Sequence, residues 1–242
     1  MSRAGQVALV TGGNKGIGFE ICRRLGELGV TVLVGARSRN RGVEAAERLV
    51  LEGASAEWVP LDVVDAVSVE RAATAIEDRF GKLDILVNNA GIFLPEPTPG
   101  ALDAGTMKAV YETNVFGVQR VTSAMLPLLR RSPAGRIVNM SSSLGSLGLH
   151  GDPSFELGGF LASAYNSSKT AVNAMTVMLA KELAGTPIKV NAADPGYCAT
   201  DMNGRSGPRT PAQGARAAVR LAMLPADGPT GRLFDEKGPL PW

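Results

Sequence analysis

Tyr165 and Lys169, which lie four positions apart, are the residues of this sequence best suited to proton transfer. The apolar residues that follow them recur at spacings of three and four, which predicts a helix reaching Leu183. Positions i and i+4 share one face of a helix, so both side chains can reach a common small molecule. A free tyrosine has a pKa of about 10, and a nearby ammonium favours the phenolate. We therefore expect Tyr165 to donate a proton and Lys169 to lower the pKa of its hydroxyl.

The glycine-rich stretch at residues 11–18 suits a phosphate group. It follows a short apolar run at 7–10 and precedes a predicted helix at 19–28. Glycines let a ligand approach the backbone closely, and the bare N–H groups of a helix N-terminus bind phosphate. The spacing Gly-x-x-x-Gly-x-Gly differs from the common G-x-G-x-x-G, but the strand–turn–helix context is the one that gives such a turn meaning.

The residues after the second predicted strand indicate which dinucleotide is bound. Arg37 follows that strand (31–34), and no Asp or Glu stands nearby. An acidic residue here would hold the 2′-hydroxyl of NAD, whereas an arginine suits the 2′-phosphate of NADP. Lys15 adds a second positive charge, so the sequence favours NADP over NAD. In the alternative interpretation Arg37, Arg39 and Arg41 are solvated loop charges.

Strand and helix patterns alternate along the chain, which predicts a parallel sheet with right-handed crossovers. The expected strands are 7–10, 31–34, 56–61, 83–87, 135–140, 188–193 and a short one at 233–234. The expected helices are 19–28, 42–51, 66–80, 106–130, the one that carries Tyr165, and a last one that opens at Thr210. Pro127 should kink or end its helix. Residues 144–161 are predicted to form a loop, with His150 as a loop residue.

Polar residues follow several of the predicted strands, at the carboxyl edge where ligands of such sheets bind. Asp62 follows the third strand, residues 88–91 the fourth, and the serine run 141–143 the fifth. Asp62 could accept a hydrogen bond from an adenine amino group. It could equally serve as a turn residue or helix N-cap, and its position does not decide between the two.

Composition excludes several other classes of function. The net charge of the 242 residues is +2 and no basic block stands out, which argues against nucleic acid and anionic membrane as partners. The single histidine and two separated cysteines suggest neither a metal site nor a disulfide framework. The first six residues hold no signal-peptide pattern, and no apolar run reaches membrane length. A cytoplasmic protein is expected.

Taken together, these motifs resemble the short-chain dehydrogenases/reductases of the classical type along nearly the whole chain. The matching pieces are residues 11–18, Asp62, residues 88–91, Asn114, the serine run, Tyr165-x-x-x-Lys169, Pro195-Gly196 and Thr200. The glycine-rich turn and Arg37 look most like the NADPH-dependent carbonyl reductases of that family. The resemblance implies a Rossmann-type, doubly wound α/β fold, with a parallel sheet of about seven strands and helices on both faces. Residues 1–242 would form one domain, dinucleotide-binding in its first half and catalytic in its second.

The resemblance also implies a role for each matching residue. Tyr165 would protonate a carbonyl oxygen, and Lys169 would bind the nicotinamide ribose. Ser142 would hydrogen-bond the substrate oxygen, with Ser141 and Ser143 as competitors, and Asn114 would hold a water that relays protons to Lys169. The implied cofactor-binding residues are Gly12, Asn14, Lys15, Gly16, Ile17, Gly18, Arg37, Asp62, Val63, Asn89, Ala90, Gly91, Tyr165, Lys169, Pro195, Gly196 and Thr200. No metal is implied.

The implied activity is hydride transfer from NADPH to a ketone or aldehyde. An alcohol dehydrogenase working oxidatively and a non-catalytic NADP-binding sensor are the alternatives. A sensor needs no proton donor, so the complete catalytic set argues against it. The expected substrate pocket is lined by the insertion, by residues near Phe93 and Leu94, and by residues 197–208. Apolar residues there suggest an apolar or bulky substrate, although they could equally pack on one another: Leu147, Leu149, Phe155, Leu157, Phe160, Tyr197 and Met202. The 23 positions from Ser142 to Tyr165 exceed the spacing usual in the family, so we expect an insertion at the substrate mouth and leave monomer or homo-oligomer open.

Overall fold

An eight-stranded sheet forms the centre of the computed structural model, in the order β3-β2-β1-β4-β5-β6-β7-β8. The structure describes residues 5–242, so residues 1–4, part of the stretch in which no signal-peptide pattern was expected, lie outside the described residues. The strands are β1 (Val7–Thr11), β2 (Thr31–Ala36), β3 (Ala56–Pro60), β4 (Ile85–Asn88), β5 (Arg136–Met140), β6 (Lys189–Ala193), β7 (Leu233–Phe234) and β8 (Pro239–Leu240).

The strand directions confirm the predicted doubly wound topology. Strands β1 to β7 pair in parallel, whereas β8 pairs with β7 in the antiparallel direction. The expected count of about seven strands missed β8, because a strand of two residues leaves no periodic pattern in the sequence.

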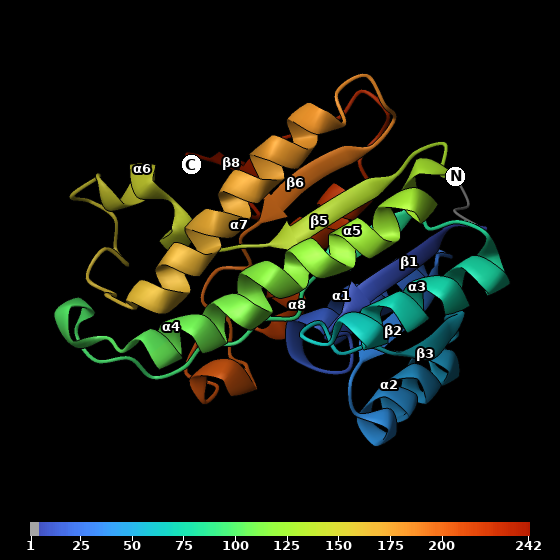
Figure 1. Ribbon diagram of the computed structural model, residues 1–242, viewed down its shortest axis with the longest axis horizontal. Coiled ribbons are helices and arrows are strands. Elements are labelled where there is room, and N and C mark those ends of the chain that lie inside the picture. The colour runs from blue at the N-terminus through green and yellow to red at the C-terminus, as the bar shows by residue number, and fades with distance from the viewer. Residues whose placement is uncertain (1–4) are drawn as a thin grey trace.

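Helices cover both faces of the sheet (Figure 1). The α-helices are α1 (Gly16–Glu27), α2 (Arg39–Leu51), α3 (Ala66–Phe80), α4 (Ala104–Tyr111), α5 (Gly117–Arg130), α6 (Leu147–His150), α7 (Ser163–Glu182) and α8 (Pro211–Ala222). Helices α1, α2 and α8 share one hydrophobic core with the sheet, and α3, α5 and α7 share a second core on the opposite face. Strand β1 is buried throughout: Ala8 and Val10 belong to the first core, and Val7 and Leu9 to the second.

The helix predicted at 106–130 is interrupted. A π-helical segment, η2 (Glu112–Phe116), separates α4 from α5 and contains Asn114. A π-helical turn holds about one residue more than an α-helical turn, and a single such turn barely disturbs the spacing of the apolar residues. The sequence pattern therefore predicts one continuous helix. Pro127 lies within α5, which ends three residues later at Arg130.

The segment predicted as a loop at 144–161 contains two short helical pieces. These are the 3₁₀ segment η3 (Ser143–Gly145) and α6. The amide of Gly148 in α6 donates to the carbonyl of Trp242 at 2.7 Å, which joins the insertion to the C-terminus. Within residues 5–242, no helix combines the length and apolarity needed to cross a membrane.

Candidate active site

A cleft of about 770 Å³ lies along the carboxyl ends of the parallel strands. It collects nearly all the cofactor residues expected from the sequence. Those lining it are Gly12, Asn14, Lys15, Gly16, Ile17, Gly18, Arg37, Asp62, Val63, Asn89, Ala90, Gly91, Tyr165, Lys169, Pro195 and Thr200. The lining does not include Gly196, Ser142 or Asn114. The structure therefore brings the glycine-rich turn and the Tyr165–Lys169 pair to one continuous cleft.

The glycine-rich turn is tied to the end of β4. Thr11 Oγ1 accepts the N–H groups of Asn89 and Ala90, each at 2.9 Å, and Asn89 Nδ2 donates to the carbonyl of Thr11 at 2.9 Å. Gly12 and Gly16 have φ of +64° and +55°, a left-handed backbone that favours glycine. At these glycines the turn presents backbone to the cleft, as a phosphate cradle requires.

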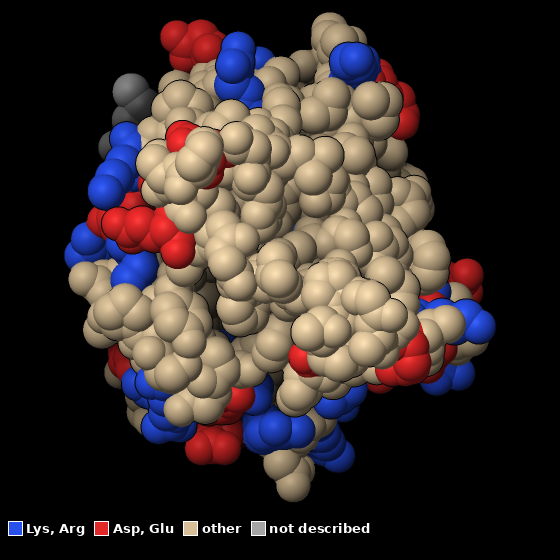
Figure 2. Space-filling view, turned by 90° about the vertical axis from the view of Figure 1, so that its left-hand side faces the viewer, with Lys and Arg blue, Asp and Glu red and all other residues tan. Residues whose placement is uncertain are grey.

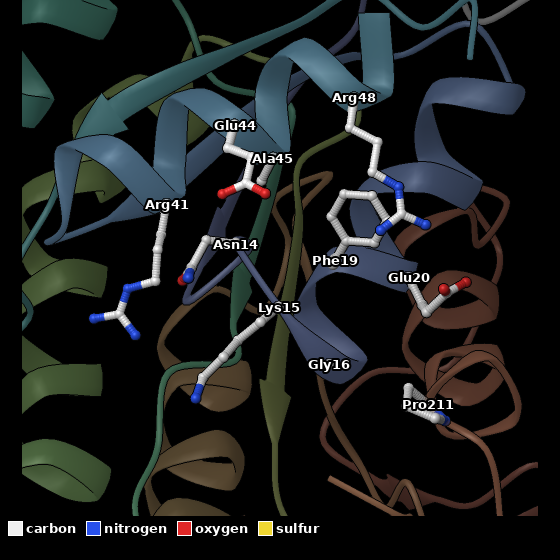
Figure 3. Close-up of a pocket in the computed structure, with 10 residues that line it drawn as sticks. All are labelled: Asn14, Lys15, Gly16, Phe19, Glu20, Arg41, Glu44, Ala45, Arg48 and Pro211. Carbon is white, nitrogen blue, oxygen red and sulfur yellow. The ribbon is translucent and has the colours of Figure 1, made fainter. Parts of the chain in front are cut away.

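Positive side chains flank this turn. Arg37 lines the cleft, and Lys15 Nζ pairs with Asp201 at 2.9 Å across its mouth. A smaller hollow of about 350 Å³ lies between α1 and α2 and also includes Lys15 (Figure 3). Figure 3 shows Arg41 and Lys15 extending in the same direction, away from Arg48, whose guanidinium lies 4.5 Å from the Phe19 ring centroid.

Asp62 is a turn residue at the cleft, and its expected contact with adenine stays a prediction. It lines the cleft and is half-buried, and its Oδ1 accepts the N–H of Val64 at 3.2 Å as a turn residue does. The N-cap of α3 is Asp65, which accepts from Val67 at 2.9 Å. Asp62 is therefore a turn residue that also faces the cleft, and it does not cap the helix.

Helix α7 places Tyr165 and Lys169 on the cleft wall. Lys169 Nζ lies 5.5 Å from the Tyr165 ring centroid and donates to the carbonyl of Met140 at 2.9 Å. Burial lowers the pKa of Lys169 to about 8, against the opposing effect of the Asp194 carboxylate. Burial, with a smaller contribution from Asp194, raises the pKa of Tyr165 above its usual value.

The net shift of the Tyr165 pKa is upward, the opposite of the shift expected from Lys169. Burial is the main cause, because it disfavours the charged phenolate, and the Asp194 carboxylate adds to it. The Tyr165 hydroxyl is protonated at neutral pH, as that of an ordinary tyrosine is. The side chain therefore has a proton to give.

The three serines after β5 differ in how their hydroxyls are used. Ser141 Oγ donates to Asn173 Oδ1 at 2.5 Å, and Ser143 hydrogen-bonds the Asp194 carboxylate. Ser142 Oγ accepts the N–H of Leu144 at 3.2 Å, and an accepting hydroxyl keeps its own hydrogen to donate. Ser142 is 8% exposed, whereas Ser141 lines the cleft.

Asn114 is bound to the loop after β4 rather than to Lys169. Its Oδ1 accepts the N–H of Ile92 at 2.8 Å, and its Nδ2 donates to the carbonyl of Ile92 at 2.9 Å and to Ser168 Oγ at 3.1 Å. A Cβ on Gly91 would lie 3.3 Å from Asn114 Oδ1 and 3.7 Å from Lys169 Nζ. Gly91 thus leaves space between the two side chains. The water relay through Asn114 stays a prediction.

Several residues near the site were missed by sequence reasoning. Asp194 is 7% exposed and accepts the N–H of Gly196 at 2.9 Å; its only signal in the sequence is an acid directly before Pro-Gly. Glu96 reaches the start of α7, although nothing in its local sequence marks it. Phe93, by contrast, lies where the sequence places the substrate pocket: it lines the cleft and contacts the Tyr165 ring edge-on, with the centroids 5.7 Å apart.

The outer face beside the cleft carries few charges. Figure 2 shows the side that lies to the left in Figure 1, where α6 and the start of α7 lie, and uncharged residues cover most of it. Of the seven apolar residues expected to line the substrate pocket, Met202 lines the cleft. Phe160 contacts Phe93 at 5.9 Å between centroids, and Leu161 and Leu147 are 60% and 68% exposed. The insertion therefore meets the cleft where Phe160 contacts Phe93.

Comparison with known proteins places the chain in one family. A family model described as short chain dehydrogenase matches residues 6–210. The chain is similar to (-)-isopiperitenone reductase of Mentha piperita, with 36% identity over 97% of both chains. It is also similar to carbonyl reductase (NADPH) 1 of Homo sapiens, with 35% identity over 100% of both.

Solved structures agree with this placement. Salutaridine reductase of Papaver somniferum matches with a TM-score of 0.81 and 32% identity, over 95% of this chain and 99% of that one. The active-site complex of Pseudomonas aeruginosa RhlG with NADP matches with a TM-score of 0.84 and 32% identity, over 97% and 95%. With a family model over most of its length, full-length relatives and the Tyr165–Lys169 pair at the cleft, this chain belongs to the short-chain dehydrogenase family.

Proposed function

We propose that this enzyme transfers hydride from NADPH to the carbonyl carbon of a ketone or aldehyde. The observation that carries the proposal is the single cleft that joins the glycine-rich turn to Tyr165 and Lys169. Relatives named as an isopiperitenone reductase, a salutaridine reductase and an NADPH carbonyl reductase support the reaction class. Oxidation of an alcohol is the reverse reaction through the same groups.

The residues present fit a nicotinamide dinucleotide. The turn offers backbone N–H groups to its phosphates, Asp62 and Val63 line the adenine end, and Gly91 leaves room beside Lys169. When bound, NADPH supplies the hydride, and the protein supplies placement and charge. Arg37 and Lys15, with Arg41 nearby, favour the 2′-phosphate of NADP over the hydroxyl of NAD.

The proton reaches the carbonyl oxygen from Tyr165. Its hydroxyl is protonated at neutral pH, and the nearby Lys169 ammonium would stabilise the phenolate that forms. Ser142 would donate to the same carbonyl oxygen, because its neighbours Ser141 and Ser143 already use their hydroxyls elsewhere.

Replacing Tyr165 by Phe tests the reaction. Without the acid, carbonyl reduction should fall by about a hundredfold or more, while NADPH binding stays close to that of the wild type. Absorbance of NADPH measures turnover across a panel of ketones, and fluorescence of the bound dinucleotide measures binding. Tyr111→Phe is the matched control, since Tyr111 packs on Phe116 outside the cleft. Undiminished turnover in the Tyr165 variant would contradict the proposal that Tyr165 protonates the carbonyl oxygen.

Replacing Arg37 by Asp tests the dinucleotide. The carboxylate would repel a 2′-phosphate and hold a 2′-hydroxyl, so the ratio of kcat/KM for NADPH to that for NADH should fall below that of the wild type. Arg39→Asp is the control, because Arg39 begins α2 but does not line the cleft. A wild type that already prefers NADH contradicts this part of the proposal.

An apolar, bulky carbonyl compound is the substrate class that we favour. Ile92, Phe93 and Met202 line the same cleft as Tyr165, and uncharged residues cover most of the face shown in Figure 2. We also propose that the chain acts as one domain, because strands from both halves share one sheet. The cytoplasmic location and the choice between monomer and homo-oligomer stay predictions.

A further inference from the structure

The helix that carries Tyr165 lacks a cap of its own. Its N-cap residue is Ala162, whose methyl side chain cannot accept a hydrogen bond, although a helix begins with free N–H groups. The carboxylate of Glu96 takes this role from a distant part of the chain. Its Oε2 accepts the N–H of Ala164 at 2.8 Å, and its Oε1 accepts the N–H of Tyr165 itself at 3.0 Å.

Glu96 belongs to a loop that is fastened at both ends to the catalytic residues. At the start of this loop, Asn114 binds both the N–H and the carbonyl of Ile92. At its end, Glu96 binds the backbone of Tyr165. Between these anchors, Phe93 lies edge-on against the Tyr165 ring, with the centroids 5.7 Å apart.

The sequence around Glu96 stiffens this attachment. Pro95 and Pro97 flank it, each proline has a fixed φ, and a residue that precedes proline is confined to extended conformations. Little conformational freedom then remains for Glu96 to lose when it binds the helix. A serine or aspartate at position 162 would have capped α7 locally, but it would have left the loop and Phe93 unattached.

We propose that Glu96 is a positioning residue that sets Tyr165 and Phe93 against the carbonyl substrate by joining the cleft wall to the catalytic helix. The proposal rests on the proposed function. Glu96 does not touch the substrate; it acts through the backbone of Tyr165 and through the placement of Phe93. A change of Glu96 therefore alters both the transfer of the proton and the fit of the substrate, and it leaves dinucleotide binding nearly unchanged.

Four variants test this role. In Glu96→Ala both hydrogen bonds are lost, and we expect kcat/KM for a ketone to fall about tenfold, with a lower kcat, a higher KM and an unchanged Kd for NADPH. In Glu96→Gln one acceptor oxygen remains, so the loss should be smaller. In Glu96→Ala with Ala162→Ser the helix regains a local cap, and thermal stability should recover while kcat/KM stays low. Asp103→Ala is the control, because Asp103 caps a different helix: it is the N-cap of α4 and accepts the N–H of Thr106 at 2.9 Å. This variant should leave kcat/KM near that of the wild type.

Fluorotyrosine labelling gives a readout that does not depend on turnover. The chain has three tyrosines, and Tyr165→Phe identifies the resonance of Tyr165. That resonance should shift in Glu96→Ala and in the double variant, and it should stay in place in Asp103→Ala. An unshifted resonance, or full recovery of kcat/KM by Ala162→Ser, would overturn the proposal. Absence of carbonyl reduction by the wild type would instead overturn the proposed function, and the resonance would still decide the role of Glu96.

Discussion

Asp194 is the charged residue that most directly affects the catalytic pair. It lies at the end of β6, almost fully buried, and it hydrogen-bonds both Gly196 and Ser143. Burial raises the pKa of its own carboxyl, while these hydrogen bonds lower it. Its negative charge raises the pKa of Tyr165 and of Lys169. One carboxylate therefore favours the protonated form of both groups.

Removal of this charge should move the pH profile of the enzyme. In Asp194→Asn the pKa of Lys169, now about 8, should fall, and so should the pKa of Tyr165. Both groups then lose their protons at lower pH, so the alkaline limb of kcat/KM for carbonyl reduction should move to lower pH. Rate profiles of the wild type and the variant measure the shift, with the exposed Asp227→Asn as control. A limb that stays in place, or moves upward, contradicts the role given to Asp194.

The functional residues differ in how far the sequence could predict them. Tyr165 and Lys169 are predictable because a fixed spacing of four places them on one face of one helix. Asp194 and Glu96 act through contacts that join segments far apart in the chain, and no local pattern encodes such contacts. The raised pKa of Tyr165 was also out of reach, since burial is its main cause and burial depends on the whole fold.

At the scale of elements, the first turn of α1 allows no extra atom at Gly18. A Cβ there would lie 2.4 Å from the carbonyl oxygen of Gly12 and 2.5 Å from Asn89 Nδ2. Asn89 is the residue that ties the glycine-rich turn to β4. The shape of the phosphate cradle therefore depends on the absence of a side chain at one position.

Replacing Gly18 by Ala should distort the cradle and weaken dinucleotide binding. Overpacking of this kind costs about 1–3 kcal/mol, so the Kd for NADPH should rise about tenfold or more. Titration of bound NADPH fluorescence measures it. Gly100→Ala serves as the matched control, because a Cβ at Gly100 meets nothing within 4 Å. Equal affinity in both variants would show that the turn adapts to the added methyl group.

The π-helical segment η2 shows where element prediction failed. Apolar spacing indicates one helix across residues 106–130, and only the poor helix propensity of Asn114 hinted at an interruption. The bulge carries Asn114 to the backbone of Ile92, a partner on another element. The local pattern thus predicted that a helix exists here. The π-helical segment inside it accompanies a tertiary contact, between Asn114 and Ile92, that no local pattern encodes.

At the scale of the whole molecule, two hydrophobic cores hold the sheet between its helical layers. Leu86 in β4 is fully buried in the core shared with α3 and α5, whereas Leu51 at the end of α2 is 89% exposed. Leu86→Ala should lower the free energy of unfolding by about 2–5 kcal/mol through lost burial and a cavity. Leu51→Ala should change it by less than about 0.5 kcal/mol. Denaturant unfolding measures both, and equal losses would contradict this account of the core.

The global topology was the most predictable level. Alternating strand and helix patterns, with right-handed crossovers, leave few arrangements for a parallel sheet, and the observed order is among them. The insertion and the C-terminal hairpin were less predictable, because short elements lack periodicity. Their positions come from contacts such as that between Gly148 and Trp242.

That contact has a practical consequence for recombinant work. Trp242 is hydrogen-bonded to Gly148 in α6, which belongs to the insertion. At the other end of the insertion, Phe160 contacts Phe93 of the cleft. Gly5, by contrast, precedes β1 and lies at the opposite end of the parallel strands. A purification tag fused after Trp242 would emerge beside α6 and pull on the insertion, whose other end contacts Phe93 in the cleft. A tag fused ahead of β1 is the better choice for kinetic assays and for crystallisation.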